Sequence, residues 1–245
     1  MLFVSGHKSD KGLLRENNED SIYVNDKVGV YVLADGMGGH EGGEMASNIA
    51  VNTIAKILYS TYAERQKKNF QQIVHKALQQ ANEEIILFRK RDINLSNMGT
   101  TVVISIFLDE VFYYTHLGDS RAYLYKKEET LIQLTTDDSL VMEMIKQGMI
   151  SKDELITHNL RHIVTRYLGT PELVLPELQH CDVELNDCVI LCSDGLTNML
   201  SDKEISSVLR GNISRGPQSV CNALVDKANT NGGDDNISVI VIQNK

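Results

Sequence analysis

The amino-acid sequence predicts an α+β fold, a four-layer αββα sandwich of two antiparallel β-sheets flanked by helix pairs. Several short runs of β-branched residues are bounded by turn residues, as antiparallel strands are. Two helix pairs accompany them, each helix with one apolar stripe. Because a sheet and an amphipathic helix must each bury an apolar face, the sheets are expected to pack on each other, with the helices outside.

The first elements are three strands, at 2–7, 21–25 and 28–34, each short and rich in β-branched residues. Asp26–Lys27 is short enough to form a tight turn, so the second and third strands are expected to form a hairpin.

Two helices are predicted next, at 43–59 and 69–90. In both, apolar residues recur with helical spacing while polar residues fill the other faces. Each helix is therefore expected to bury one side only.

The middle of the chain predicts four more strands, at 100–108, 111–117, 121–126 and 130–134. The turn Gly118–Asp119–Ser120 is expected to close a hairpin between the second and third of these.

After these strands, residues 138–157 have an irregular helical pattern, and 158–180 show no strong period. We therefore expect a mobile flap at about 145–170.

The last part of the chain predicts a strand at 187–193, short helices near 195–210, a helix at 217–229 and a strand at 236–242. Pro217 suits the first turn of its helix. With no linker or repeat in the sequence, residues 1–245 are expected to form one catalytic domain.

Composition excludes several classes of protein. Acidic residues outnumber basic ones 33 to 24, a formal net charge of −9, which argues against a nucleic-acid partner. Neither a signal peptide nor a transmembrane segment is recognisable. The four cysteines form no Cys-x-x-Cys pair, so buried thiols and a cytoplasmic location are expected.

The most informative feature is the position of the carboxylates at strand ends. Two apolar runs lead directly into an Asp-Gly pair, two other predicted strands begin directly after a pair of acidic residues, and one Asp follows the strand at 111–117. The acidic residues at these positions are Asp35, Asp194, Glu19, Asp20, Asp235 and Asp119. In an antiparallel sheet the end of one strand neighbours the start of the next, so the first five of these groups are expected to converge at one edge.

Such a cluster needs a cation. At an effective dielectric constant of about 20, two like charges about 4 Å apart repel by about 4 kcal/mol. Oxygen ligands select Mg²⁺ or Mn²⁺ over zinc. The alternative is that each Asp-Gly pair is an ordinary turn, which holds for any one pair alone. The joint pattern, with the glycines that follow Asp35, favours a metal site.

The sequence resembles the metal-dependent protein phosphatases (PPM, type 2C), in particular their bacterial single-domain serine/threonine phosphatases. The resemblance spans essentially the whole chain, and the matching motifs occur in the family's order: Gly12-Leu-Leu-Arg15-Glu-Asn-Asn18-Glu19-Asp20, Asp35-Gly-Met-Gly-Gly-His40, Met98-Gly-Thr-Thr101, Gly118-Asp119-Ser120-Arg121, Asp138-Ser139-Leu140, Thr165-Arg166-Tyr-Leu-Gly169, Ser193-Asp194-Gly195-Leu196 and Gly232-Gly233-Asp234-Asp235-Asn236-Ile237-Ser238.

This resemblance implies two core ions, Mn²⁺ or Mg²⁺. Asp35 would bridge both ions, and the Gly36 carbonyl would contact the second. Asp194 and Asp235 would complete the first ion's shell, while Glu19 and Asp20 would act mostly through bound water. A bridging hydroxide would then attack phosphorus in line.

Arg15 would grip the substrate phosphate, since a guanidinium fork suits phosphate better than a lysine does. The alternative for Arg15 is an ordinary surface arginine.

Two further roles are open. His40 could protonate the leaving oxygen as a general acid, or be a simple loop histidine, since Met37 stands where the family often has the histidine. Asp119, with Asp194, could hold a possible third ion, or be a hairpin-turn residue. His158 and His162 are expected to be surface or substrate-loop residues.

The predicted function is therefore hydrolysis of phosphoserine and phosphothreonine in proteins phosphorylated by a cognate serine/threonine kinase, by a monomer. The alternatives are a phosphoprotein-binding pseudophosphatase, although no core Asp is lost, and a metal-dependent phosphodiesterase, against which the missing basic stripe weighs.

Overall fold

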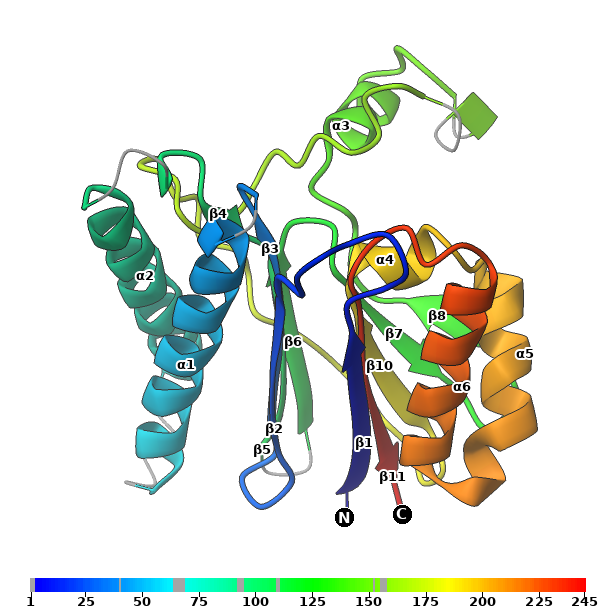
Figure 1. Ribbon diagram of the computed structural model, residues 1–245. Helices are drawn as coiled ribbons and strands as arrows, with labels where there is room; N and C mark the ends of the chain where they lie inside the picture. The colour runs from blue at the N-terminus through cyan, green and yellow to red at the C-terminus, as the bar shows by residue number, and fades with distance from the viewer. Residues whose placement is uncertain are drawn as a thin grey trace.

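A computed structural model of the chain describes residues 3–39, 41–63, 69–91, 95–108, 111–151, 153–154 and 158–245. Two antiparallel sheets face each other, and helices cover the outer face of each (Figure 1). The predicted αββα sandwich is confirmed.

One sheet has the strand order β1-β11-β10-β7-β8. Its strands are β1 (Phe3–Asp10), β11 (Ile237–Asn244), β10 (Cys188–Cys192), β7 (Arg121–Tyr125) and β8 (Leu131–Gln133). The first and last strands pair along their whole length, from Phe3 opposite Asn244 to Asp10 opposite Ile237. Both chain ends therefore lie at the same end of the sandwich (Figure 1).

The second sheet has the order β2-β3-β5-β6-β9, and a short strand, β4, pairs with the end of β3. Its strands are β2 (Asp20–Asn25), β3 (Val30–Met37), β4 (Gly99–Thr100), β5 (Val102–Leu108), β6 (Val111–Leu117) and β9 (Gln179–Cys181). β2 and β3 form the predicted hairpin, with Asp20 opposite Asp35.

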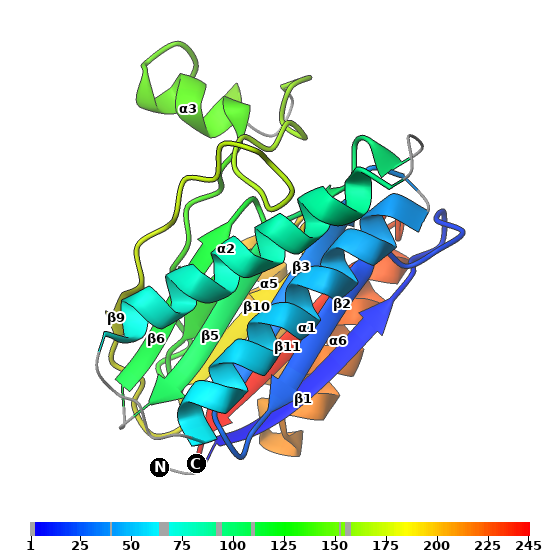
Figure 2. The ribbon, with the colours of Figure 1, turned by 90° about the vertical axis from the view of Figure 1, so that its left-hand side faces the viewer.

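Helices α1 (Glu41–Ala63) and α2 (Phe70–Arg89) lie side by side across the sheet that contains β3 (Figure 2). Helices α4 (Asp194–Thr197), α5 (Asp202–Asn212) and α6 (Pro217–Thr230) cover the other sheet, with a 3-10 turn at Ile213–Arg215. No helix in the described part of the chain combines the length and apolarity needed to cross a membrane.

The core has three apolar layers, and β3 shows how one strand serves two of them. Val30, Val32 and Ala34 pack towards α1 and α2. Tyr31 and Leu33 point the other way, into the layer between the sheets. Because successive side chains alternate between two buried faces, the strand is an uninterrupted apolar run.

One predicted pairing is wrong. β6 and β7 do not form a hairpin, because the 118–120 turn carries the chain from one sheet to the other. The Gly118 carbonyl accepts a hydrogen bond from Asp138 N at 2.9 Å, and the Asp138 carboxylate accepts one from Gly118 N at 3.2 Å. With φ of 106°, Gly118 makes this bend where a side chain would be strained. It is β7, not β6, that shares a sheet with the strand before Asp194.

The predicted flap is part of a segment that projects from the body of the molecule (Figure 1). It begins with α3 (Leu140–Lys146), which is shorter than the predicted helical stretch at 138–157. Its two arms are joined at the base, where Leu140 N donates to Ile163 O at 2.8 Å. Residues 165–170 run back along the body, and Gly169 N donates to the Asn82 side chain at 2.7 Å.

Candidate active site

The site begins with the β2–β3 hairpin, whose register brings two carboxylates together. Asp20 opens β2 and Asp35 lies near the end of β3, directly opposite. Asp35 N donates to Thr101 Oγ1 at 3.1 Å, and Thr100 Oγ1 donates to Asp35 O at 2.8 Å. The threonines of the Met98–Thr101 motif therefore fix the backbone of Asp35.

Asp194 and Asp235 come from the facing sheet. Asp194 begins α4 directly after β10, and Asp235 precedes β11, which pairs with β10. Between them and Asp20 lies Ser193, whose hydroxyl donates to Asp20 Oδ2 at 2.8 Å and accepts from Ser238 N at 2.9 Å. This bridge links the two sheets at the end of the sandwich that holds the acids.

Two glycines allow the backbone segments beside the carboxylates to lie in close contact. A Cβ on Gly195 would collide with the Asn236 carbonyl, and a Cβ on Gly36 would collide with the backbone of Gly43 and Glu19. Glycine at these positions lets the backbone segments beside the carboxylates touch.

The carboxylates raise one another's pKa. The pKa of Asp35 lies well above its ordinary value, first because of burial and then because of Asp20, Asp194, Asp119 and Asp235. Burial is also the main cause that raises the pKa of Asp20 to about 7, although hydrogen bonds from Ser238 and Ser193 oppose it.

Asp119 belongs to the same electrostatic group. Burial raises its pKa to about 7, and the charges of Asp194 and Asp137 add to the rise. Burial and Asp235 raise the pKa of Asp194 in turn. The protein thus concentrates negative charge that water does not screen.

The donor set fits a hard divalent cation. Asp20 Oδ1 is buried and has no hydrogen-bond partner in the structure. Every donor of the group is a carboxylate oxygen, as Mg²⁺ and Mn²⁺ prefer. Within the described ranges, however, no three His, Cys, Asp or Glu side chains already form a closed ligand set.

Arg15 lies beside this group, as its predicted role requires. Its Nη2 forms an ion pair with Asp235 Oδ2 at 2.8 Å, and half of its side chain stays exposed. Gly12 packs against the Asp235 carbonyl, and Leu13 N donates to Gly233 O at 2.7 Å. The Arg15 loop and the Asp235 loop are therefore one unit.

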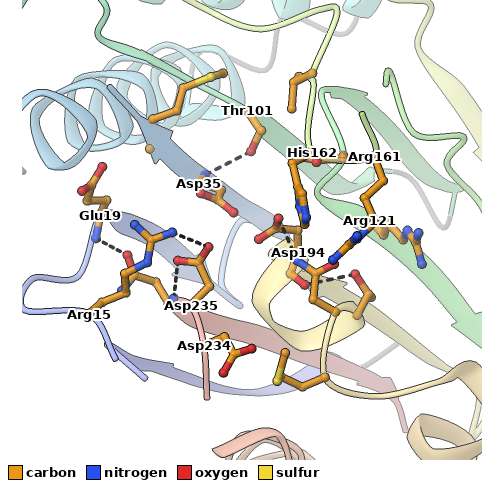
Figure 3. A pocket seen from close by; sticks show the side chains of 18 of the residues that line it. Arg15, Glu19, Asp35, Thr101, Arg121, Arg161, His162, Asp194, Asp234 and Asp235 are labelled. Atoms are coloured by element: carbon orange, nitrogen blue, oxygen red, sulfur yellow. Dashed lines mark hydrogen bonds and ion pairs between the residues drawn. The ribbon is translucent and has the colours of Figure 1, made fainter. Parts of the chain in front are cut away.

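Glu19 lines the cleft, but its carboxylate lies against Gly43 in the first turn of α1, away from Asp35 (Figure 3). Its backbone N donates to Asn236 Oδ1 at 2.8 Å. Asp20, not Glu19, therefore approaches the carboxylate group. His40 lies outside the described residues.

Sequence reasoning missed part of the cleft wall. Arg121 lines it, held by a two-bond ion pair with Asp137, with Nε–Oδ1 at 2.8 Å and Nη2–Oδ2 at 2.7 Å. Arg161 and His162 reach the cleft from the projecting segment (Figure 3). Arg121 stands in a quoted motif and could have been found, and His162 was expected to be a surface or substrate-loop residue, whereas no pattern marks Arg161.

The comparisons with known proteins agree with this geometry. The family model described as protein phosphatase 2C matches residues 14–219. The serine/threonine phosphatase stp of Listeria innocua is 34% identical over 239 residues, covering 96% of this chain and 94% of that protein. Protein phosphatase PhpP of Streptococcus pneumoniae is 35% identical over 238 residues, with coverage of 96% and 94%.

Solved structures extend the likeness to three dimensions. The crystal structure of the Mycobacterium tuberculosis serine/threonine phosphatase PstP/Ppp has a TM-score of 0.90 and 31% identity, and covers 100% of both chains. A structure of the PstP catalytic domain in complex with two manganese ions has a TM-score of 0.86 and 31% identity, covering 98% of this chain and 97% of that one.

The fold and the carboxylate-lined cleft define a metal-dependent phosphatase of proteins phosphorylated on serine or threonine. The chain belongs to the protein phosphatase 2C family.

Proposed function

We propose that Asp35, Asp194 and Asp235, with the Gly36 carbonyl, hold two core cations, Mn²⁺ or Mg²⁺, and that Asp20 and Glu19 act on them through water. The observation that carries this assignment is the convergence of buried carboxylates from the two sheets. Burial first, and the charges of the neighbouring carboxylates second, raise the pKa of Asp20, Asp35 and Asp194. When bound, two such cations supply an activated water and offset charge on the phosphoryl group.

The protein's own groups bind and orient the substrate. The Arg15 guanidinium, paired with Asp235, has further N–H donors free to hold phosphate oxygens in a planar fork. Such donors stabilise the charge that develops on the transferring phosphoryl group. His40 is our proposal for the proton donor to the leaving oxygen.

We expect Arg15→Ala to raise KM for a phosphopeptide about tenfold or more, because the lost contact is made with the bound substrate as well as with the transition state. A steady-state titration with a phosphothreonine peptide measures this. Arg215→Ala, which removes an exposed arginine that does not line the cleft, is the matched control. A KM equal to that of the wild type would place Arg15 outside the substrate site.

Asp119 is our proposal for a ligand of a third, weaker ion shared with Asp194. A site with so few protein oxygens keeps several waters and binds weakly. Asp119→Ala should therefore keep the metal-induced rise in Tm but need more Mn²⁺ for turnover, or turn over more slowly at every Mn²⁺ concentration. Unchanged Mn²⁺ dependence and rate, with a stability loss of about 1 kcal/mol or less, would make Asp119 only a turn residue.

The remaining assignments concern the protein as a whole. We propose that residues 1–245 form a single catalytic domain with a flap, that it acts as a monomer because one chain supplies the whole cleft, and that it works in the cytoplasm. All four cysteines are free thiols, which fits a reducing compartment. A serine/threonine kinase must supply the phosphorylated substrates.

One assay tests the proposed mechanism against its rivals. Release of phosphate from a phosphothreonine peptide is measured with Mn²⁺, with Mg²⁺ and with EDTA. We expect turnover with either metal and none with EDTA. Binding without turnover would indicate a pseudophosphatase. Faster hydrolysis of bis-p-nitrophenyl phosphate than of the monoester would indicate a phosphodiesterase.

A further inference from the structure

The arginines and the lysine that line the cleft differ in their pairing. Arg15 and Arg121 are each bound to a carboxylate. The exposed side chains of Arg161 and Lys203 form no hydrogen bond or ion pair with any residue in the described ranges. Both side chains therefore have N–H donors available to an anion in the cleft.

Arg161 is held in place by its backbone. Arg161 N donates to His158 O at 3.2 Å, and Ile163 N donates to Leu160 O at 3.1 Å. Leu140 N in turn binds Ile163 O at the base of the projecting segment. Backbone hydrogen bonds therefore define the turn that carries Arg161, while its guanidinium group has no partner among the described residues.

Arg161 lies on the side of the cleft opposite Arg15 (Figure 3). The side chain of its neighbour His162 points towards Asp194 in the same cleft (Figure 3). The arm that carries Arg161 therefore reaches the edge of the carboxylate group.

Lys203 lines the same cleft from the first turn of α5. Asp202 and Glu204 of the same turn already complement the helix dipole. Lys203 forms no ion pair with either residue, so its ammonium group can meet an anion in the cleft. We call Arg161 and Lys203 the cationic rim.

The scissile phosphate is assigned to Arg15 and the carboxylate-held cations, so another part of the substrate must meet the cationic rim. We propose that the rim binds a second anionic group of the phosphoprotein, a carboxylate or a further phosphate near the phosphorylated residue. The enzyme then prefers acidic sequences. This inference rests on the proposed function.

The test uses phosphothreonine peptides that differ only beside the phosphorylated residue, with Glu, Ala, Lys or a non-hydrolysable phosphonate. We expect kcat/KM to be about fivefold higher for the Glu and phosphonate peptides than for the Ala peptide, and lowest for the Lys peptide. The preference should shrink between about 0.05 M and about 0.5 M salt. If only the phosphonate peptide is preferred over the Ala peptide, the ligand of the cationic rim is a second phosphate. If the Glu peptide is preferred as well, the rim also binds carboxylates.

The variants are compared by the Glu-to-Ala ratio of kcat/KM, which does not depend on the fraction of folded protein. The ratio should fall towards one in Arg161→Ala and Lys203→Ala, and Arg161→Glu should favour the Lys peptide. Arg215→Ala removes the same charge outside the cleft and should keep the wild-type ratio. A wild-type enzyme that does not favour either anionic peptide over the Ala peptide, or a preference that survives in both rim variants, would overturn the inference. Failure to hydrolyse any phosphopeptide with Mn²⁺ would instead contradict the proposed function.

Discussion

Asp194→Asn is expected to lower turnover of a phosphopeptide at least about a hundredfold, because bound metal contributes several kcal/mol to stabilising the transition state. Asn keeps the shape of Asp and one oxygen, so the Asn198 side chain, which donates to Asp194 Oδ2 at 3.0 Å, can still find an acceptor. The loss should come from the missing charge, not from unfolding.

Metal binding can be measured apart from activity. A ligand that binds only the folded protein raises Tm, so the wild type should gain Tm with Mn²⁺ and Asp194→Asn should gain little. Asp202→Asn is the matched control: Asp202 lines the same cleft but accepts from Tyr123 OH at 3.2 Å, outside the carboxylate group. A folded Asp194→Asn protein with normal rates and a normal Mn²⁺ shift would rule out the dinuclear assignment.

The metal-free protein is expected to lose stability as pH rises from about 4 through about 7. Burial and neighbouring carboxylates raise the pKa of Asp20 and Asp119 to about 7 in the folded state and that of Asp35 well above its ordinary value. Across this range the folded state binds more protons than the unfolded state, so the free energy of unfolding falls as pH rises. Because the groups interact, the total loss should be about 2–4 kcal/mol, or roughly 5–15 °C in Tm.

Thermal melts in EDTA from about pH 5 to about pH 8 measure this. Mn²⁺ should remove the fall, because it binds the ionised carboxylates. Asp35→Asn should flatten the slope, whereas Asp226→Asn, which removes an exposed carboxylate paired with Lys8, should leave it unchanged. A Tm in EDTA that stays constant or rises over this range would contradict the picture of mutually repelling buried acids.

The sequence determined the elements whose signals are local. The hairpin of β2 and β3 follows from two apolar runs and a short turn, and its register alone places Asp20 opposite Asp35. The amphipathic stripes of α1 and α2 likewise predict which face each helix buries. The motifs that carry Asp194 and Asp235 indicated the metal chemistry through their joint pattern with Asp35, since a single Asp at a strand end is as common in an ordinary turn.

Only the tertiary structure decided the contacts between distant segments. The 118–120 turn resembles a hairpin locally, but β6 and β7 belong to different sheets. Each strand pairs with a neighbour in the chain on one side, β5 or β8, and with a distant strand on the other, β9 or β10. β9 is three residues long and exists through its pairing with β6. The stretch at 158–180, where β9 begins, shows no strong period, so no local pattern predicts this strand.

The arrangement of side chains in the cleft also could not be predicted from local sequence patterns. Packing between loops pairs Arg15 with Asp235 and turns Glu19 towards Gly43. It also leaves Arg161 at the cleft without a partner in the part of the chain that the structure describes. Residue type and spacing predict which groups bind metal and phosphate, because that chemistry is intrinsic to the side chains. Which of them face one another is decided by long-range packing, which brings together residues far apart in the sequence.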